Sequence, residues 1–178
     1  MNKENLVRML LAFLATTTII ALGSSGASGQ ATLIGVHGQA PLNCRTNPNA
    51  IVGSWLIQLG NGNRILQTFT SDRTIVEAGQ GDIVAPFQEN FPSFTAGHGA
   101  WTCDADGNWV STVVIVMYDV RNPFVYLGQF KSHEKFALSD PNNLSGPHRL
   151  DITLPDGSVI DGGSTGTSNG KRVLAEPF

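Results

Sequence analysis

From Asn49 onward the chain consists of short segments in which apolar and polar residues alternate, separated by turn sequences. In segment 64–70, Ile65, Gln67 and Phe69 share one face, which is the two-residue period of a half-buried β-strand. No stretch of this region has the period of about 3.6 residues that is typical of an amphipathic helix. The strands expected from this pattern cover 51–58, 64–70, 73–78, 98–103, 109–119, 125–139, 144–154, 159–162 and 171–176. The sequence predicts an all-β fold, either an antiparallel up-and-down barrel of about eight to nine strands or a sandwich.

Two segments depart from this even spacing of strands. Segment 79–97 is a long connection that contains Phe87, Phe91 and Phe94, and long loops of this kind are usually lids or compact surface loops. We expect its aromatic side chains either to close the mouth of a barrel or to pack on themselves. Segment 162–170 is rich in Gly, Ser and Thr, and we expect it to be a flexible hairpin tip.

The N-terminal residues have the layout of a secretory signal peptide. A short head with Lys3 and Arg8 precedes an apolar stretch and then a run of small residues. We predict a signal peptide at 1–29, a flexible leader at 30–48 and a single domain at 49–178. The apolar stretch is short for a membrane span, which needs about 20 residues, so we expect no stable membrane anchor and a secreted or periplasmic protein.

The charge and the cysteines exclude some classes of partner. A formal net charge of −3 with scattered charges argues against nucleic acid as a partner. The chain has two cysteines, Cys44 and Cys103, which in an exported protein are expected to form a disulfide, the alternative being two buried thiols. His98, His133 and His148 lack the local spacing of metal ligands, and we expect neither a metal nor a cofactor.

Three motifs occur in order along the all-β region: Ile51-Val-Gly53-Ser-Trp55, then Gly97-His-Gly-Ala-Trp101, then Gly170-Lys-Arg172-Val. In this order they resemble a family of small secreted bacterial lipocalin-like (calycin-type) β-barrels. The resemblance covers roughly 50–178 and implies a cup that holds a small hydrophobic molecule. It also implies that Trp55 lies at the closed end of the barrel with Arg172 packed across it, a structural role. The chain departs from typical lipocalins because it has no helix after the last strand.

Segment 125–139 has one charged residue on a mainly apolar face. Glu134 lies between Phe130 and Phe136 on that face, and burial of a carboxyl group raises its pKa. Glu134 is therefore a candidate general acid or base, and the alternative is a twist that pairs it with a lysine at the rim. His98, between two glycines, is a second candidate for ligand binding or proton transfer, or else a hydrogen-bonded corner residue.

The expected ligand contacts are the large aromatic side chains of the strands and of the long loop: Phe69, Trp101, Tyr118, Phe130, Phe87 and Phe91. Three functions are consistent with these residues. The first is an exported barrel that binds a small hydrophobic ligand in its interior. The second is a cofactor-free isomerase, cyclase or dehydratase that uses the same cavity with Glu134 and His98. The third is a barrel filled by its own side chains that acts as a protein-interaction module.

Overall fold

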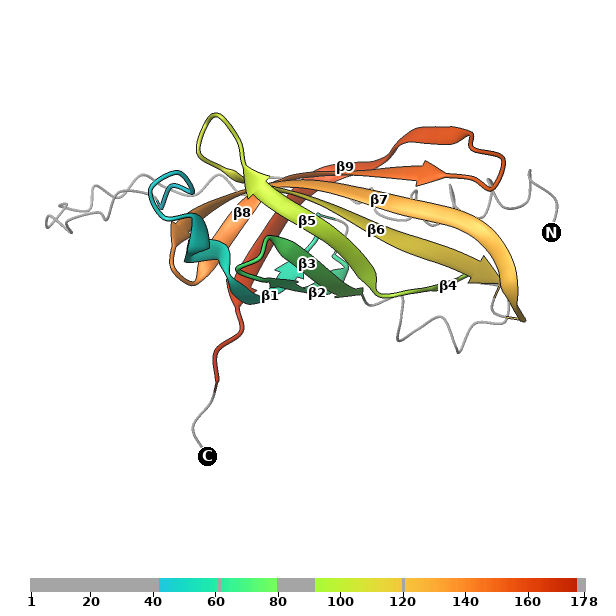
Figure 1. The fold of residues 1–178 in the computed structure, drawn as a ribbon, viewed down its shortest axis with the longest axis horizontal. Coiled ribbons are helices and arrows are strands. Elements are labelled where there is room, and N and C mark those ends of the chain that lie inside the picture. Colours follow the sequence, from blue (N-terminus) through green and yellow to red (C-terminus); the bar gives the residue numbers. More distant parts are fainter. Residues whose placement is uncertain (1–41, 61, 80–91, 120, 176–178) are drawn as a thin grey trace, which may run out of the picture. The chain divides into compact units, whose positions relative to one another are not determined.

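The structure is a computed structural model that describes residues 42–60, 62–79, 92–119 and 121–175. The predicted signal peptide, most of the predicted leader, and Phe87 and Phe91 lie outside the described residues. A short 3-10 helix, η1 (Pro48–Ile51), precedes nine strands that account for most of the described chain (Figure 1). They are β1 (Gly53–Gln58), β2 (Arg64–Phe69), β3 (Thr74–Gly79), β4 (Pro92–Phe94), β5 (Gly97–Cys103), β6 (Trp109–Asp119), β7 (Asn122–Asp140), β8 (Asn143–Thr153) and β9 (Val159–Arg172).

The strands form one antiparallel sheet that closes into an eight-strand barrel. Its strand order is β4-β6-β5-β3-β2-β1-β9-β8-β7. An additional pairing of β6 with β7, the last strand in this order, closes the barrel. The short strand β4 pairs with β6 beyond the stretch that pairs with β5. It therefore occupies the same position in the barrel as β5, and the barrel has eight strands. The predicted barrel is confirmed, and closure leaves the eight strands without free edges along their paired lengths.

Alternation and turn chemistry explain the hairpins. Burial alternates along β2 and β3, as the sequence pattern predicts. Between β5 and β6, the Asp104 carboxylate accepts hydrogen bonds from the backbone N–H groups of Asp106 and Asn108, both at 2.9 Å. Gly107 has a φ of 87° in this turn, a left-handed conformation that glycine adopts without the strain of a Cβ.

The glycine-rich part of β9 differs from the sequence prediction. Segment 162–170 was expected to be a hairpin tip, but β9 runs continuously from Val159 to Arg172 and pairs with β8 from Thr153 back to Asn143. Neighbouring side chains take the space that larger residues would need. A Cβ on Gly166 would lie 2.9 Å from the His148 ring, and one on Gly170 would lie 2.7 Å from Leu144. The small residues of β9 are therefore explained by packing, although their composition is typical of loops.

Trp55 and Arg172 are cross-strand partners of β1 and β9 at one end of the barrel. The Arg172 guanidinium lies 4.2 Å from the centre of the Trp55 ring, the arrangement that the lipocalin resemblance implies. It donates hydrogen bonds to the carbonyls of Val52 (2.6 Å), Pro141 (2.7 Å) and Ala50. This cation therefore joins the start of β1, the turn before β8 and the last strand.

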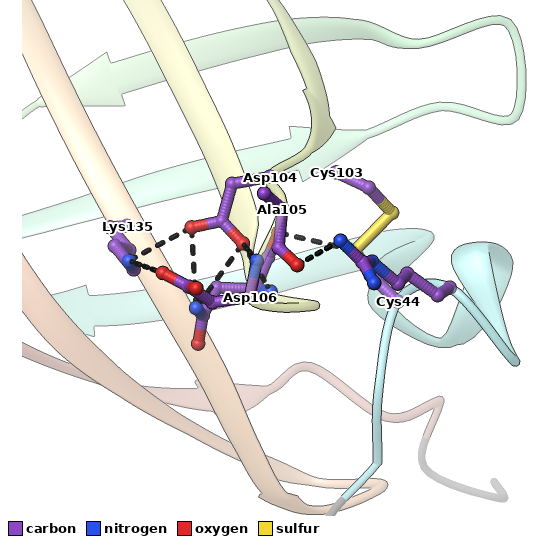
Figure 2. Close-up of polar contacts among 8 residues, drawn as sticks. Cys44, Cys103, Asp104, Ala105, Asp106 and Lys135 are labelled. Carbon is purple, nitrogen blue, oxygen red and sulfur yellow. Dashed lines mark hydrogen bonds and ion pairs between the residues drawn. A yellow bond between two sulfur atoms is a disulfide. The ribbon is translucent and has the colours of Figure 1, made fainter.

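The same end carries a disulfide between Cys44 and Cys103, as the sequence predicts. Residues 42–48, which the sequence assigns to the leader, lie against the barrel here: Cys44 is buried, and the Trp109 indole N–H donates to the Pro48 carbonyl at 2.8 Å. Figure 2 shows the neighbouring ion pairs, in which Lys135 of β7 contacts Asp104 at 2.9 Å and Asp106 at 3.2 Å. The Lys135 ammonium, followed by backbone hydrogen bonds of the turn, holds the pKa of Asp104 well below its usual range.

Candidate functional site

The inward faces of the barrel strands begin with an apolar layer at the disulfide end. Cross-strand partners share a face of a sheet, so the register defines this layer, which we call the floor. Phe69 makes edge-to-face contacts with Trp101 and Phe136, with ring centroids 6.4 Å and 6.1 Å apart. The floor comprises Trp55, Phe69, Ile75, Trp101, Trp109, Phe136, Leu138 and Leu144, all of them buried.

One inward position further along the strands, the side chains become polar. Gln67 precedes Phe69 on β2, Glu77 follows Ile75 on β3, and Ser111 follows Trp109 on β6. We call this layer the polar belt: Gln67, Glu77, Ser111, Ser132, Glu134, His148 and Ser168. All seven are buried, with Gln67 and Ser168 at 0% exposure and Glu134 at 3%.

An amide group connects two carboxyl groups of the belt. The Gln67 Nε2 group donates to Glu77 Oε2 at 2.8 Å and to the two Glu134 oxygens at 2.9 Å and 2.8 Å. The Ser111 hydroxyl donates to Glu134 Oε2 at 2.8 Å. Among the described residues, Gln67 Oε1 is a buried acceptor with no hydrogen-bond partner. An uncompensated buried polar atom is unfavourable by about 1–3 kcal/mol and is rare in proteins.

The protonation of this pair follows from its surroundings. Burial raises the pKa of Glu134, and the hydrogen bonds from Gln67, Ser111 and Ser132 oppose that rise only in part. The Glu77 and Glu134 carboxyls lie within two hydrogen-bond lengths of each other through Gln67 Nε2. Two negative charges this close in an apolar interior repel strongly, which favours a state in which the pair holds a proton.

A second polar pair lies on the opposite flank of Glu134. His148 of β8 is the cross-strand partner of Glu134, and its Nδ1 is 3.0 Å from the Ser168 hydroxyl of β9. Burial lowers the pKa of His148, so the neutral imidazole is favoured. The belt therefore contains a carboxyl pair and, on the strand next to that of Glu134, a neutral histidine.

Beyond the belt the inward faces become apolar again. Phe94 pairs with Met117, and Ile115 pairs with Phe130, so these side chains share the inward face. The rings of Phe94 and Phe130 are 5.5 Å apart between centroids. We call this layer the far-end residues: Phe94, Ile115, Met117, Phe130, Leu150 and Ile152. Phe94, Ile115, Phe130 and Leu150 are half-buried, whereas the floor is closed to solvent.

The sequence-predicted site residues lie in different layers. Glu134 is in the belt and Phe130 is among the far-end residues, whereas Phe69 and Trp101 belong to the floor, where the Trp101 indole donates to the Thr70 carbonyl at 3.0 Å. Tyr118 is half-buried beside a register shift in β6. His98 is exposed on β5, between the inward positions of Gly97 and Gly99. The structure thus brings Glu134 together with belt residues, and His98 is not one of them.

Sequence reasoning missed the partners of Glu134. Gln67 and Glu77 each stand two residues from a buried aromatic or aliphatic residue on the inward face, the same signal that singled out Glu134. In each strand this signal is a single polar residue on the inward face. It becomes specific only when the register places Gln67 opposite Glu77 and Ser111 opposite Glu134.

Neither a metal-binding cluster nor a similar known protein identifies the site. In the described residues there is no cluster of three or more His, Cys, Asp or Glu side chains able to hold a metal ion. Within the same residues, no helix has the length and apolar character needed to cross a bilayer. A scan against protein-family models and searches of curated proteins and of solved structures found no match. The inference of function therefore depends on the site itself.

Proposed function

We propose that this protein is an exported, lipocalin-like barrel that binds a small molecule with an apolar body and one polar group. The observation that carries the proposal is the polar belt between two apolar layers, with the Gln67 carbonyl oxygen buried and unpartnered. A ligand whose body contacts the half-buried Phe94 and Phe130 would present its polar group to the belt. Export is supported by the signal-like N-terminus and by the disulfide.

The energetics of burial support binding over a barrel that is merely filled. Burying polar groups in an apolar interior is unfavourable unless they are hydrogen-bonded, and a filled barrel gains stability from apolar side chains at such positions. Binding sites for small molecules combine apolar walls with a few convergent polar groups. The belt and the far-end residues supply both components on adjacent layers.

A second function is favoured by one specific observation, the raised pKa of Glu134. A neutral Glu134 beside the Glu77 carboxyl would provide a proton donor and a proton acceptor within one site. This arrangement suits cofactor-free isomerisation, cyclisation or dehydration of a bound apolar molecule, which needs orientation and proton transfer.

Native mass spectrometry of the protein purified from its own host tests the binding proposal first. We expect a small-molecule mass that is released on denaturation. If the released molecule is converted on incubation with fresh protein to a product with a different chromatographic retention (an isomer or cyclised form) or with a mass lower by one water, the acid–base function is supported. Recovery of the bare polypeptide alone, from a sample that also fails to bind an apolar fluorescent probe, would refute the binding proposal.

Substitution at the far end tests where the ligand lies. Phe130→Ala removes a half-buried inward ring, and we expect about tenfold weaker binding of the probe N-phenyl-1-naphthylamine, read from its fluorescence. Leu66→Ala is the matched control, because Leu66 is 43% exposed on the outer face of β2. Equal affinities of the two variants would place the probe elsewhere.

A further inference from the structure

The part of the belt formed by Gln67, Glu77 and Glu134 offers mainly hydrogen-bond acceptors. The Gln67 amide N–H groups, the Ser111 hydroxyl and the Ser132 hydroxyl already donate to the carboxyl oxygens of Glu77 or Glu134. The unpartnered atom is an acceptor, Gln67 Oε1. Carboxylate oxygens accept more than one hydrogen bond each, so an arriving group that donates finds several partners at Gln67, Glu77 and Glu134.

The belt also lacks a positive charge. Every lysine and arginine in the described part of the chain lies in a turn or on an outward face, except Arg172. Arg172 covers Trp55 at the floor end, where its donors are occupied by backbone carbonyls. His148 is the other titratable group beside Glu134, and burial favours its neutral form. An organic anion would therefore meet two carboxyl groups and no lysine or arginine of the described residues on the inward face of the belt.

We infer that the ligand presents a hydrogen-bond donor to Gln67, Glu77 and Glu134, and that the favoured class is an apolar molecule ending in a protonated amine. This inference rests on the proposed binding function and adds the chemistry of the ligand's polar group. An ammonium group offers three donors and one positive charge, which matches a carboxyl pair and an amide oxygen. A hydroxyl group offers one donor and no charge, and a carboxylate offers neither a donor nor a positive charge.

Proton release follows from the same contacts. Glu77 from β3, Glu134 from β7 and His148 from β8 are the described titratable groups of the belt, with Glu77 and Glu134 bridged by Gln67 and His148 opposite Glu134 across the sheet. An ammonium ion favours the ionised form of the carboxyl pair, so its binding displaces the proton that the pair holds. We therefore expect amine affinity to fall as the pH is lowered, and a proton to be released to the buffer on binding at neutral pH.

The test compares decylamine, decanol and decanoate, which share a chain and differ in the terminal group, as competitors of N-phenyl-1-naphthylamine. We expect decylamine to displace the probe at a concentration about tenfold lower than decanol, and decanoate to be the weakest. In Glu134→Gln we expect decylamine to lose this advantage, with decanol unchanged. The matched control Asp106→Asn removes the same formal charge from an exposed side chain and should keep the preference.

The outcomes separate the inference from the binding function. Probe displacement with decanoate equal to or stronger than decylamine would overturn the inference and leave the binding function intact. A probe that does not bind at all would remove both. If Glu134→Gln fails to fold, Glu77→Gln takes its place, and calorimetry of decylamine binding to the wild type in two buffers of different ionisation enthalpy measures the proton release directly. Binding without proton release would count against the inference.

Discussion

Glu134→Gln should change how the stability of the barrel depends on pH. Burial raises the pKa of Glu134, so the folded protein holds a proton that the unfolded chain gives up above the ordinary glutamate pKa of about 4.3. The stabilising contribution of Glu134 is therefore complete below that pH and is lost as the pH rises through the folded-state pKa. A glutamine keeps an oxygen that can accept from Gln67 and Ser111 but does not ionise. Glu134→Gln should thus become more stable relative to the wild type as the pH rises.

The magnitude follows from linkage. One proton bound more tightly by the folded state changes the free energy of unfolding by at most about 1.4 kcal/mol per pH unit, so the difference between variant and wild type should grow at up to this rate. Glu134→Ala should behave differently, because two buried donors, the Ser111 and Ser132 hydroxyls, lose an acceptor at about 1–3 kcal/mol each, while the Gln67 amide keeps Glu77 as an acceptor. We expect roughly 2–6 kcal/mol of destabilisation from these losses, before any contribution from the cavity.

Urea unfolding followed by tryptophan fluorescence measures both effects, because the indoles of the floor are buried. His148 titrates in the opposite sense: burial lowers its pKa, so its contribution rises with pH toward the ordinary histidine pKa of about 6.5. The contributions of the surface aspartates cancel in the difference between variant and wild type, whereas that of His148, the cross-strand partner of Glu134, need not. A difference that stays flat or falls between about pH 5 and pH 8 would refute the assignment of a raised pKa to Glu134.

Two further predictions concern the disulfide end of the barrel. Replacing Cys44 and Cys103 with serine removes a covalent link across a sequence separation of 59. We expect the free energy of unfolding, measured by urea titration, to fall by about 4 kcal/mol. A loss near zero would mean that the unfolded chain is already constrained at this end. Arg172→Met keeps an apolar stem over Trp55 but removes the donors to three carbonyls, and we expect about 2–4 kcal/mol of destabilisation by the same assay. An unchanged midpoint and slope for Arg172→Met would show that water replaces those hydrogen bonds without loss.

The strands were predictable where one face is apolar, as on β2 and β7. They were not predictable in the second half of β9, because its inward positions are Gly166, Ser168 and Gly170. The space that these residues leave is taken by His148, Leu144 and Ile57 from neighbouring strands. A reading of local hydrophobicity contains no information about those neighbours, so the segment resembled a loop.

The site was predictable to the extent that single residues break an apolar face. Glu134 is such a residue, flanked by phenylalanines on a long strand. The meeting of Gln67, Glu77 and Glu134 depends on strand register, which tertiary packing sets and no single strand encodes. Which way the His98 side chain points could not be predicted either. The glycines on both sides of His98 have no side chain that would indicate which face of the strand is inward.

The pairing of β1 with β9 gives the chain a definite order of assembly. Most neighbouring strands are joined by short hairpins and form locally, but Trp55 pairs with Arg172 across almost the whole domain. During synthesis from the N-terminus, the edge of β1 that pairs with β9 therefore remains unpaired until β9 has left the ribosome. Non-local pairing of this kind slows folding and leaves a strand edge available to other chains. A barrel that closes only when β9 pairs with β1 folds late in the chain, which is compatible with the export proposed above.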